Sequence, residues 1–272
     1  MIIDFHTHTF PDKMAEHTIS KLERSAHLTA FADGTVHGLI ASMKESGIDL
    51  SVILPVVTNP PKADEINEYA AEANSEHPEI HSFGGIHPDT ENYRDVLKRA
   101  KGLGLKGIKL HPEFQGVDFD DIRYKRILSS TEELGLITLV HAGFDGSYPD
   151  SQRCWTRHIL NVIEDVKPKK LVVAHMGGCN IWDEVKKNLA GAEVYFDTAF
   201  SFGEKQLSGL LSEEQFISLS RTHGTKKILF GTDSPWCEQK EMTDFVKNSS
   251  LTEEEKSDIL GLNAKRLLDS VQ

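Results

Sequence analysis

The feature that most constrains the fold is a regular alternation of short apolar runs and longer helical patterns along the whole chain. The runs are rich in β-branched residues, and some, such as Leu136–Val140, are almost wholly apolar. Strands that are buried on both faces have this composition, as in parallel sheets that are covered by helices. The eight runs are Ile2–Phe5, Leu50–Val57, Ile80–Ile86, Leu105–Leu110, Leu136–Val140, Lys170–Ala174, Glu193–Asp197 and Lys226–Phe230.

A helical pattern follows each of the first seven runs, and one more closes the chain. Strand–helix alternation indicates a parallel α/β fold. Eight repeats favour a closed (β/α)8 TIM barrel, which takes roughly 250 residues, and we expect one such domain over residues 1–272. The competitor, an open doubly wound sheet, is disfavoured because no Gly-rich phosphate turn follows the first run. Helices are predicted over Thr35–Ser46, Ala63–Glu76, Asn92–Lys101, Asp121–Glu133, Arg153–Val166, Ile181–Leu189, Glu213–Thr222 and from Thr252 to about Asp269.

Charge and cysteine content narrow the partners and the compartment. A net charge of −12 argues against nucleic acid or an anionic membrane as the main partner. The three cysteines, Cys154, Cys179 and Cys237, are scattered and form no CxxC pair, which is typical of a reducing, cytoplasmic setting. No apolar run approaches the roughly 20 residues of a membrane span. We therefore expect a small-molecule substrate, and a homodimer stays open.

Polar residues fall where several predicted strands end. His6 and His8 end the first run, and because side chains two apart on a strand share a face, they leave the backbone in parallel. His141 and His175 directly follow the fifth and sixth runs, and Asp233 follows the eighth. Active sites of barrels lie at the C-terminal ends of the strands. These five side chains are therefore predicted to meet at one rim.

Histidine and carboxylate ligands without a thiolate suit zinc, and they also suit iron(II), manganese or cobalt. With an open coordination position, such a metal lowers the pKa of its bound water to about 7 and polarises a substrate oxygen. A carboxylate such as Asp233 beside that water could accept its proton. The pattern therefore predicts a catalytic metal centre.

Five ordered motifs carry a family resemblance. They resemble those of the amidohydrolase superfamily over nearly the whole chain, and most of all its amidohydrolase-related branch, which also holds aminocarboxymuconate-semialdehyde decarboxylase-like enzymes. The ordered set is specific to the superfamily but not to one reaction. The motifs are His6-Thr7-His8, Leu139-Val140-His141, Val173-Ala174-His175-Met176-Gly177-Gly178, Phe230-Gly231-Thr232-Asp233-Ser234-Pro235 and Asn263-Ala264-Lys265-Arg266-Leu267-Leu268.

The resemblance implies a metal site and a catalytic pair. His6, His8, His141 and Asp233 would bind one metal per chain, which we expect to be zinc. Asp233 would also take the proton of the water. The histidine that matches His175 is an acid/base group in mononuclear members, or polarises the substrate oxygen, and binds a second metal in binuclear ones. A second metal therefore stays open.

The fourth run offers candidates for substrate binding. Alternation places Lys109 and His111 on one face, so Lys109 is predicted to point into the barrel, where a charge needs a partner. Lys109 could hold a substrate carboxylate, carry the metal-bridging carboxyl group of binuclear relatives, or pair with Asp4. Asp4 itself is expected on the face of His6 and His8, one step deeper.

Three further residues are candidates for the substrate pocket. His111 is a substrate-contact candidate, and Trp236 follows a metal-site strand and could line the pocket. Arg153, in the loop after His141, would suit an anionic substrate, although a surface salt bridge is the alternative.

These residues support three functions. The first is hydrolysis of an amide, ester or lactone of a small, carboxylate-bearing substrate by a metal-activated water. The alternative is non-oxidative decarboxylation of an unsaturated carboxylic acid, with Lys109 or Arg153 holding the carboxylate. The third is a metal-binding barrel without catalysis. The substrate cannot be named, because specificity in this fold lies in the loops after the strands.

Overall fold

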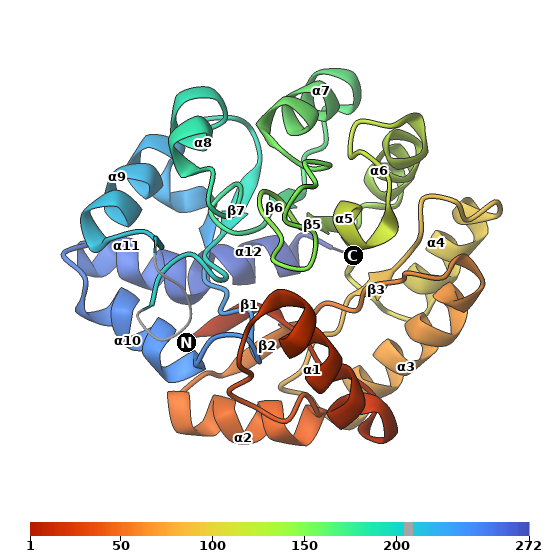
Figure 1. Cartoon of the computed structure of the whole chain (residues 1–272), viewed down its shortest axis with the longest axis horizontal. Helices are drawn as coiled ribbons and strands as arrows, with labels where there is room; N and C mark the ends of the chain where they lie inside the picture. Colours follow the sequence, from red (N-terminus) through yellow and green to blue (C-terminus); the bar gives the residue numbers. More distant parts are fainter. Residues whose placement is uncertain (204–208, 272) are drawn as a thin grey trace.

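Eight parallel strands form the centre of the molecule and helices surround them, as the computed structural model shows for residues 1–203 and 209–271 (Figure 1). This arrangement confirms the predicted (β/α)8 barrel. The strands are β1 (Ile3–Thr7), β2 (Leu50–Ile53), β3 (Gly84–Gly85), β4 (Gly107–Leu110), β5 (Ile137–Val140), β6 (Leu171–Val173), β7 (Tyr195–Asp197) and β8 (Ile228–Leu229).

Backbone hydrogen bonds close the sheet into a barrel. Strands β3 to β8 pair in chain order, and β1 pairs with β2. The join between β2 and β3 runs through the His81 N–H, which donates to the Ser51 carbonyl at 2.9 Å. The join between β8 and β1 runs through the Phe5 N–H, which donates to the Phe230 carbonyl at 2.7 Å. The first strand therefore lies between β2 and β8, and the barrel closes where the first and the last strand meet.

The helices of the outer layer agree with the predicted ones to within three residues at their first residue. The helix expected from Arg153 begins at Thr156, so Arg153 lies in the preceding loop. Helices α1, α5 and α10 were not predicted. The helices are α1 (Asp12–Ala26), α2 (Val36–Ser46), α3 (Ala63–Glu76), α4 (Tyr93–Gly102), α5 (Pro112–Gln115), α6 (Ile122–Leu134), α7 (Thr156–Val166), α8 (Trp182–Asn188), α9 (Glu213–His223), α10 (Gln239–Asn248), α11 (Glu253–Ser257) and α12 (Asn263–Asp269), with a π-helical turn at Asp258–Leu262.

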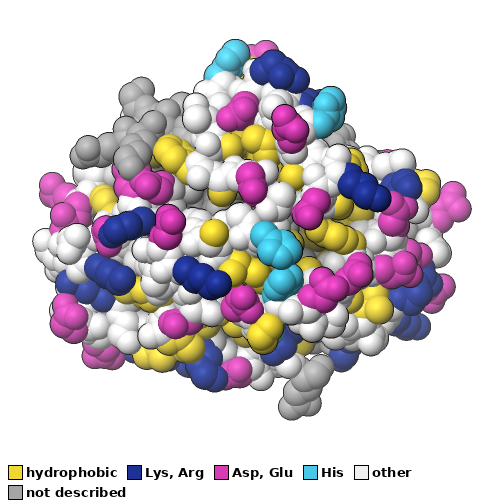
Figure 2. Space-filling model, turned by 90° about the horizontal axis from the view of Figure 1, so that it is seen from below, with side chains coloured by type: hydrophobic (Ala, Val, Ile, Leu, Met, Phe, Trp, Pro, Cys, Tyr) yellow, Lys and Arg dark blue, Asp and Glu magenta, His cyan; other side chains and the backbone are white. Residues whose placement is uncertain are grey.

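Two apolar cores lie on the two sides of the strands. The inner core joins strand residues such as Phe5, Leu139 and Val172 to Leu267 of α12, which passes behind the strands in Figure 1. The larger core lies between the strands and the surrounding helices. Within the described ranges, no helix combines the length and the apolar character that a membrane span requires. On the face in Figure 2, acidic and basic side chains are interspersed rather than gathered by sign.

A bulge in β1 changes the predicted facing of its side chains. The register of β1 against β2 shifts between Asp4 and Thr7. Phe5 belongs to the inner core, while the carboxylate of Asp4 accepts a hydrogen bond from Gln239 of α10 at 2.7 Å. The expectation that Asp4 shares a face with His6 and His8 is therefore wrong. Strict alternation fails here because a bulge inserts a residue and re-aims the next side chain.

We expect Gly107→Ala to lower the free energy of unfolding by about 1–3 kcal/mol, because overpacking forces neighbours to move. A Cβ at Gly107 would lie 2.4 Å from the buried ring of Phe83. The control is Gly102→Ala at the end of α4, where nothing lies within 4 Å of the new Cβ. Urea unfolding measures both variants, and equal stability of the two would contradict the close packing of β4 against Phe83.

We expect His223 to make the protein less stable as the pH falls from 6.5 towards 4. Its Nε2–H donates to the Val194 carbonyl at 2.9 Å and its Nδ1 accepts the Gly191 N–H at 3.2 Å, so the neutral ring satisfies both partners. Burial lowers the pKa of His223 from 6.5 to about 4. The unfolded chain therefore binds a proton in this window that the folded chain does not, which costs at most about 3 kcal/mol.

The measurement is the free energy of unfolding as a function of pH for the wild type and His223→Gln. The variant should show a shallower fall between pH 6.5 and 4, while His17→Gln, at an exposed position of α1, should follow the wild type. A slope that His223→Gln leaves unchanged would exclude this contribution.

Candidate metal centre

Three donor atoms converge at the C-terminal rim of the barrel. The Nε2 atoms of His6 and His8 lie 3.2 Å apart. The Oδ1 atom of Asp233 lies 3.5 Å from the first and 3.1 Å from the second. Ligands that are about 2.0–2.1 Å from a tetrahedral metal lie roughly 3.3–3.4 Å from one another. The spacing of the three atoms therefore suits one metal ion.

The backbone of β1 and of the loop after β8 brings these donors together. Asp233 has a left-handed backbone with φ 67°, and its N–H donates to the His6 carbonyl at 2.8 Å. Such a conformation is costly for a residue other than glycine, and it is held here by the surrounding contacts. Gly231 passes so close to β1 that a Cβ would lie 2.9 Å from the Cβ of His6. The strand ends thus set where the carboxylate meets the imidazoles.

The hydrogen-bond partner of Nδ1 in each imidazole determines which ring nitrogen faces the centre. The Nδ1 of His6 lies 2.8 Å from Oδ2 of Asp197, and the Nδ1 of His8 lies 3.0 Å from the Leu54 carbonyl. Both partners are acceptors, so both Nδ1 atoms carry the proton and both Nε2 lone pairs face Asp233. Lone pairs at this spacing repel one another, and a bound cation would relieve the repulsion. The donor set therefore fits a divalent metal.

Burial shifts the pKa values of the imidazole and carboxyl groups of the centre in opposite directions. Burial lowers the pKa of His6 well below 6.5 and keeps its ring neutral, as a metal ligand must be. Burial raises the pKa of Asp197 to about 6.

His175 and His141 lie beside this group and contact each other. The Nδ1–H of His175 donates to the Ala199 carbonyl at 2.9 Å, so its Nε2 accepts from Nδ1 of His141 at 2.9 Å. The rings of His6 and His175 are 5.2 Å apart. His141 is thus near the centre but outside the tight group of His6, His8 and Asp233. The role of His141 as a fourth ligand stays a prediction.

Lys109 is buried next to the three donors. Its Nζ lies 3.2 Å from Nε2 of His6. Burial lowers the pKa of Lys109 to about 8, against the opposing effect of Asp197 and Asp233. Lys109 does not pair with Asp4, because the Asp4 carboxylate is bonded to Thr232 and Gln239 instead. Among the residues that the structure describes, no carboxylate oxygen lies within 4 Å of this ammonium group.

The other predicted substrate residues differ in where they lie. The ring of His111 stacks on that of His141, with centroids 4.1 Å apart and planes 8° apart. Trp236 is buried after β8, and its backbone N–H donates to the Asp233 carbonyl. Arg153 instead forms an ion pair with Asp118 at 3.0 Å and is 38% exposed, which is the surface salt bridge that the sequence had left open.

Two carboxylates at the site were not among the predicted site residues. Asp197 ends the seventh predicted run, a position that suggests either the orientation of a ligand histidine or structural packing. Asp145 lies in the loop after β5, with its Oδ2 atom 3.5 Å from Nε2 of His111. No sequence pattern marks Asp145, because a loop conformation brings it to the rim.

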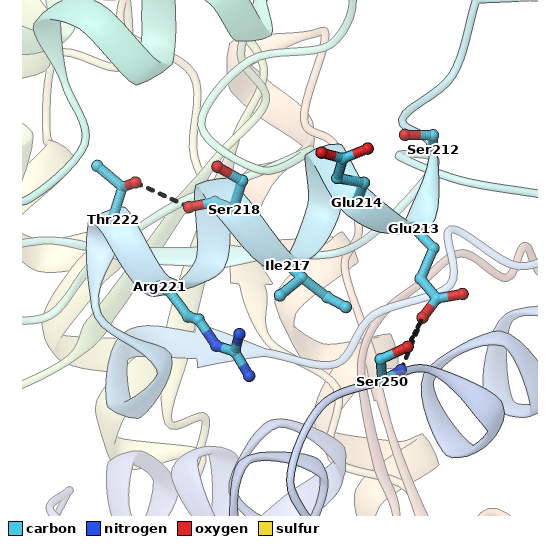
Figure 3. A pocket seen from close by; sticks show the side chains of 8 residues that line it. All are labelled: Ser212, Glu213, Glu214, Ile217, Ser218, Arg221, Thr222 and Ser250. Atoms are coloured by element: carbon cyan, nitrogen blue, oxygen red, sulfur yellow. Dashed lines mark hydrogen bonds between the residues drawn. The ribbon is translucent and has the colours of Figure 1, made fainter.

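A surface hollow lies elsewhere, along α9, and Ser212, Glu213, Arg221 and Ser250 are among its lining residues (Figure 3). Glu213 bonds to Ser250, and Arg221 pairs with Glu255 at 2.9 Å. Two of its charged side chains, Glu213 and Arg221, are therefore already paired with neighbouring residues.

Comparisons with known proteins bear on the family and the fold of the chain. A family model described as "Amidohydrolase" matches residues 3–269. A search of curated protein sequences finds no match. The solved structures that are described next share little sequence identity with the chain, so they establish the fold alone.

Three of those structures are decarboxylases. A 2,6-dihydroxybenzoate decarboxylase from Rhizobium has a TM-score of 0.73 at 16% identity and covers 98% of each chain. A dihydroxybenzoic acid decarboxylase from Polaromonas sp. JS666, with bound manganese and the inhibitor 2-nitroresorcinol, has a TM-score of 0.71 at 16% identity and covers 98% of this chain and 96% of that one. A 5-carboxyvanillate decarboxylase from Sphingomonas paucimobilis has a TM-score of 0.69 at 14% identity and covers 98% of each chain.

We expect Asp197→Asn to weaken metal binding by about 10–100-fold, as changes of outer partners do. Oδ1 of Asp197 accepts the backbone N–H groups of His175 at 2.9 Å and Ala199 at 3.1 Å, so an asparagine must keep its oxygen there. The side-chain amide nitrogen of the asparagine would then donate to Nδ1 of His6, which forces the ring proton onto the metal-facing Nε2.

The measurement is competition of the protein against a chelator for Mn²⁺ and Zn²⁺. Asp118→Asn, at a position whose side chain is 55% exposed, is the matched control and should bind as the wild type does. His6→Ala and Asp233→Ala remove donors directly and should abolish stoichiometric metal. Wild-type affinity in Asp197→Asn would show that the carboxylate does not orient His6.

Proposed function

The chain belongs to the amidohydrolase family, and on that premise we propose that it is a metal-dependent decarboxylase that releases carbon dioxide from a small unsaturated carboxylic acid. The observation that carries this proposal is Lys109, a buried ammonium group 3.2 Å from a proposed metal ligand and without a carboxylate within 4 Å among the described residues. A buried charge needs a partner, and a substrate carboxylate would supply one. The decarboxylases among the similar structures support the same reading.

Hydrolysis, which the sequence had favoured first, has less support. Of the two cations considered for the carboxylate, only Lys109 lies at the centre, since Arg153 is paired with Asp118. Lys109 could hold a carboxylate in either reaction, because the hydrolase considered also acts on a carboxylate-bearing substrate. The decarboxylases among the similar structures favour removal of that carboxylate over hydrolysis.

His6, His8 and Asp233 would hold the metal, with His141 as the predicted fourth ligand. When bound, a divalent metal such as zinc, or the manganese that the Polaromonas enzyme contains, supplies positive charge that polarises a substrate oxygen. The ammonium group of Lys109 orients the carboxylate. The burial of these groups excludes water, which strengthens their electrostatic interaction with the substrate.

In this reaction the bond between the carboxyl carbon and the rest of the substrate breaks. Carbon dioxide leaves, the electron pair stays on the substrate carbon, and one proton replaces the lost group. His175 is proposed to deliver that proton from Nε2 after the ring has taken up a proton from water, because in the neutral ring Nε2 only accepts a hydrogen bond from Nδ1 of His141. The Ala199 carbonyl holds the other side of the ring in place.

We expect Lys109→Met to reduce kcat/KM for carbon dioxide release by about 10–150-fold, the cost of losing a charge-assisted contact. Metal content should stay near that of the wild type, because Lys109 is not one of the three donors. The assay follows carbon dioxide from 2,6-dihydroxybenzoate, 5-carboxyvanillate and related acids. Arg153→Met is the matched control, and its rate should be unchanged.

Two results would count against the proposal, the first against the reaction and the second against the role of Lys109. Hydrolysis of an amide or a lactone, with no carbon dioxide from any acid tested, would restore the hydrolase. Carbon dioxide release that does not respond to Lys109→Met would remove Lys109 as the group that holds the carboxylate.

A further inference from the structure

The side-chain amide of Gln115 lies between the two chain segments that follow β3 and β4. Gln115 is the last residue of α5 and is 5% exposed. Its Oε1 accepts the backbone N–H of His111 at 3.0 Å, and its Nε2 donates to the Ile86 carbonyl at 2.7 Å. Ile86 and His111 directly follow the last residues of β3 and β4. The amide therefore joins the two strands at the rim of the barrel.

This amide stands in the place of one bond of the parallel ladder. The register sets Gly85 of β3 beside Lys109 of β4. If the ladder continued in this register, the His111 N–H would donate directly to the Ile86 carbonyl, because the bonds of a parallel ladder are evenly spaced. The amide of Gln115 is instead inserted between this donor and this acceptor.

The opposite edge of β4 has the direct bond. There the His141 N–H, which follows β5, donates to the Leu110 carbonyl at 3.1 Å. An inserted amide replaces one such contact by two, so it holds the ends of β3 and β4 apart. The spacing at this edge of β4 is therefore set by a side chain rather than by the backbone alone.

Two further contacts fix the position of the amide. Its Nε2 also donates to the Val57 carbonyl in the loop after β2, at 2.8 Å. Its Oε1 also accepts the hydroxyl of Tyr124, a fully buried side chain of α6, at 2.7 Å. All four hydrogen-bonding positions of the amide are thus used, and none is left for a substrate. Gln115 can therefore act on the site only through the strands that it holds.

The strand end that Gln115 holds carries Lys109, two residues before His111. The Lys109 side chain is 1% exposed, and its Nζ lies 3.2 Å from Nε2 of His6. A change in the spacing of β3 and β4 would move this ammonium group together with its strand. We propose that Gln115 is a positioning residue, which sets this spacing and so aims Lys109 at the substrate carboxylate. This rests on the proposed function and adds to it a residue that does not touch the substrate.

The test compares the affinities of benzoate and of its neutral analogue benzamide for the Mn²⁺-loaded protein by calorimetry. The wild type should bind benzoate about 10-fold or more tightly, or about 1.4 kcal/mol, because a charge-assisted hydrogen bond favours the carboxylate. Gln115→Ala removes the inserted amide and lets the His111 N–H bond directly to the Ile86 carbonyl. Its preference for benzoate should fall about 5-fold or more, because a misplaced ammonium group loses most of its contact, while its affinity for benzamide should stay within about 2-fold.

Asn263→Ala is the matched control. The Asn263 side chain is 1% exposed and also donates to two backbone carbonyls, those of Thr225 and Ile228 at 2.7 Å each, but at the start of β8. This variant should lose stability and keep the wild-type preference for benzoate. If Gln115→Ala does not fold, Gln115→Met keeps the length of the side chain and should lower the preference in its place.

A double variant separates positioning from a general effect on the fold. When Lys109→Met is already present, Gln115→Ala should lower the preference no further, because both changes remove the same contact. A further fall in the double variant would overturn the proposal, as would an unchanged preference in the Gln115 variants or an equal fall in Asn263→Ala. A wild type that does not prefer benzoate would overturn it as well.

Carbon dioxide release distinguishes a failure of this proposal from a failure of the proposed function. A benzoate preference that requires both Lys109 and Gln115, without carbon dioxide release from any acid tested, would contradict only the decarboxylase. Carbon dioxide release that depends on Lys109, with a preference that Gln115→Ala leaves unchanged, would contradict only the role of Gln115.

Discussion

The buried carboxylate of Asp197 is the contact on which the rest of the site depends. One oxygen accepts the ring proton of His6, and the other accepts the backbone N–H groups of His175 and Ala199. One side chain of β7 thereby joins β1 to the end of β6. Because neither oxygen can change partner without losing a bond, the tautomer of His6 and the path of the chain at His175 are set together.

The barrel places the proposed metal donors and the proposed substrate groups on different strands around this contact. The proposed metal donors come from β1 and from the loop after β8, which are neighbours only because the barrel closes. The proposed substrate groups come from β4 and from the chain after β6. Lys109 lies where the two sets meet, with its Nζ 3.2 Å from His6. The side chains most deeply buried, His6, Lys109 and Asp197, are at most 1% exposed, while His8 and Asp233 are 16% and 12% exposed. Charge is therefore concentrated at the bottom of the site, where electrostatic interactions are strongest.

The departures from the predictions have physical causes in contacts between distant segments. A bulge in β1 turns Asp4 towards α10, although a regular strand would have placed it with His6 and His8. The sequence left Arg153 open between a substrate contact and a surface salt bridge, and only the structure shows that it precedes α7 and pairs with Asp118. Asp145 reaches the rim through the conformation of its loop.

The sequence by itself determined the barrel and the rim at which its histidines and Asp233 gather. It could do so because strand periodicity and the position of a polar residue at a strand end are local properties of the chain. The tertiary structure decided which nitrogen of each histidine faces the centre, that Lys109 has no carboxylate partner among the described residues, and that Asp145 lies beside His111. These properties depend on the register between strands and on the packing of loops from distant parts of the chain, which no local pattern encodes.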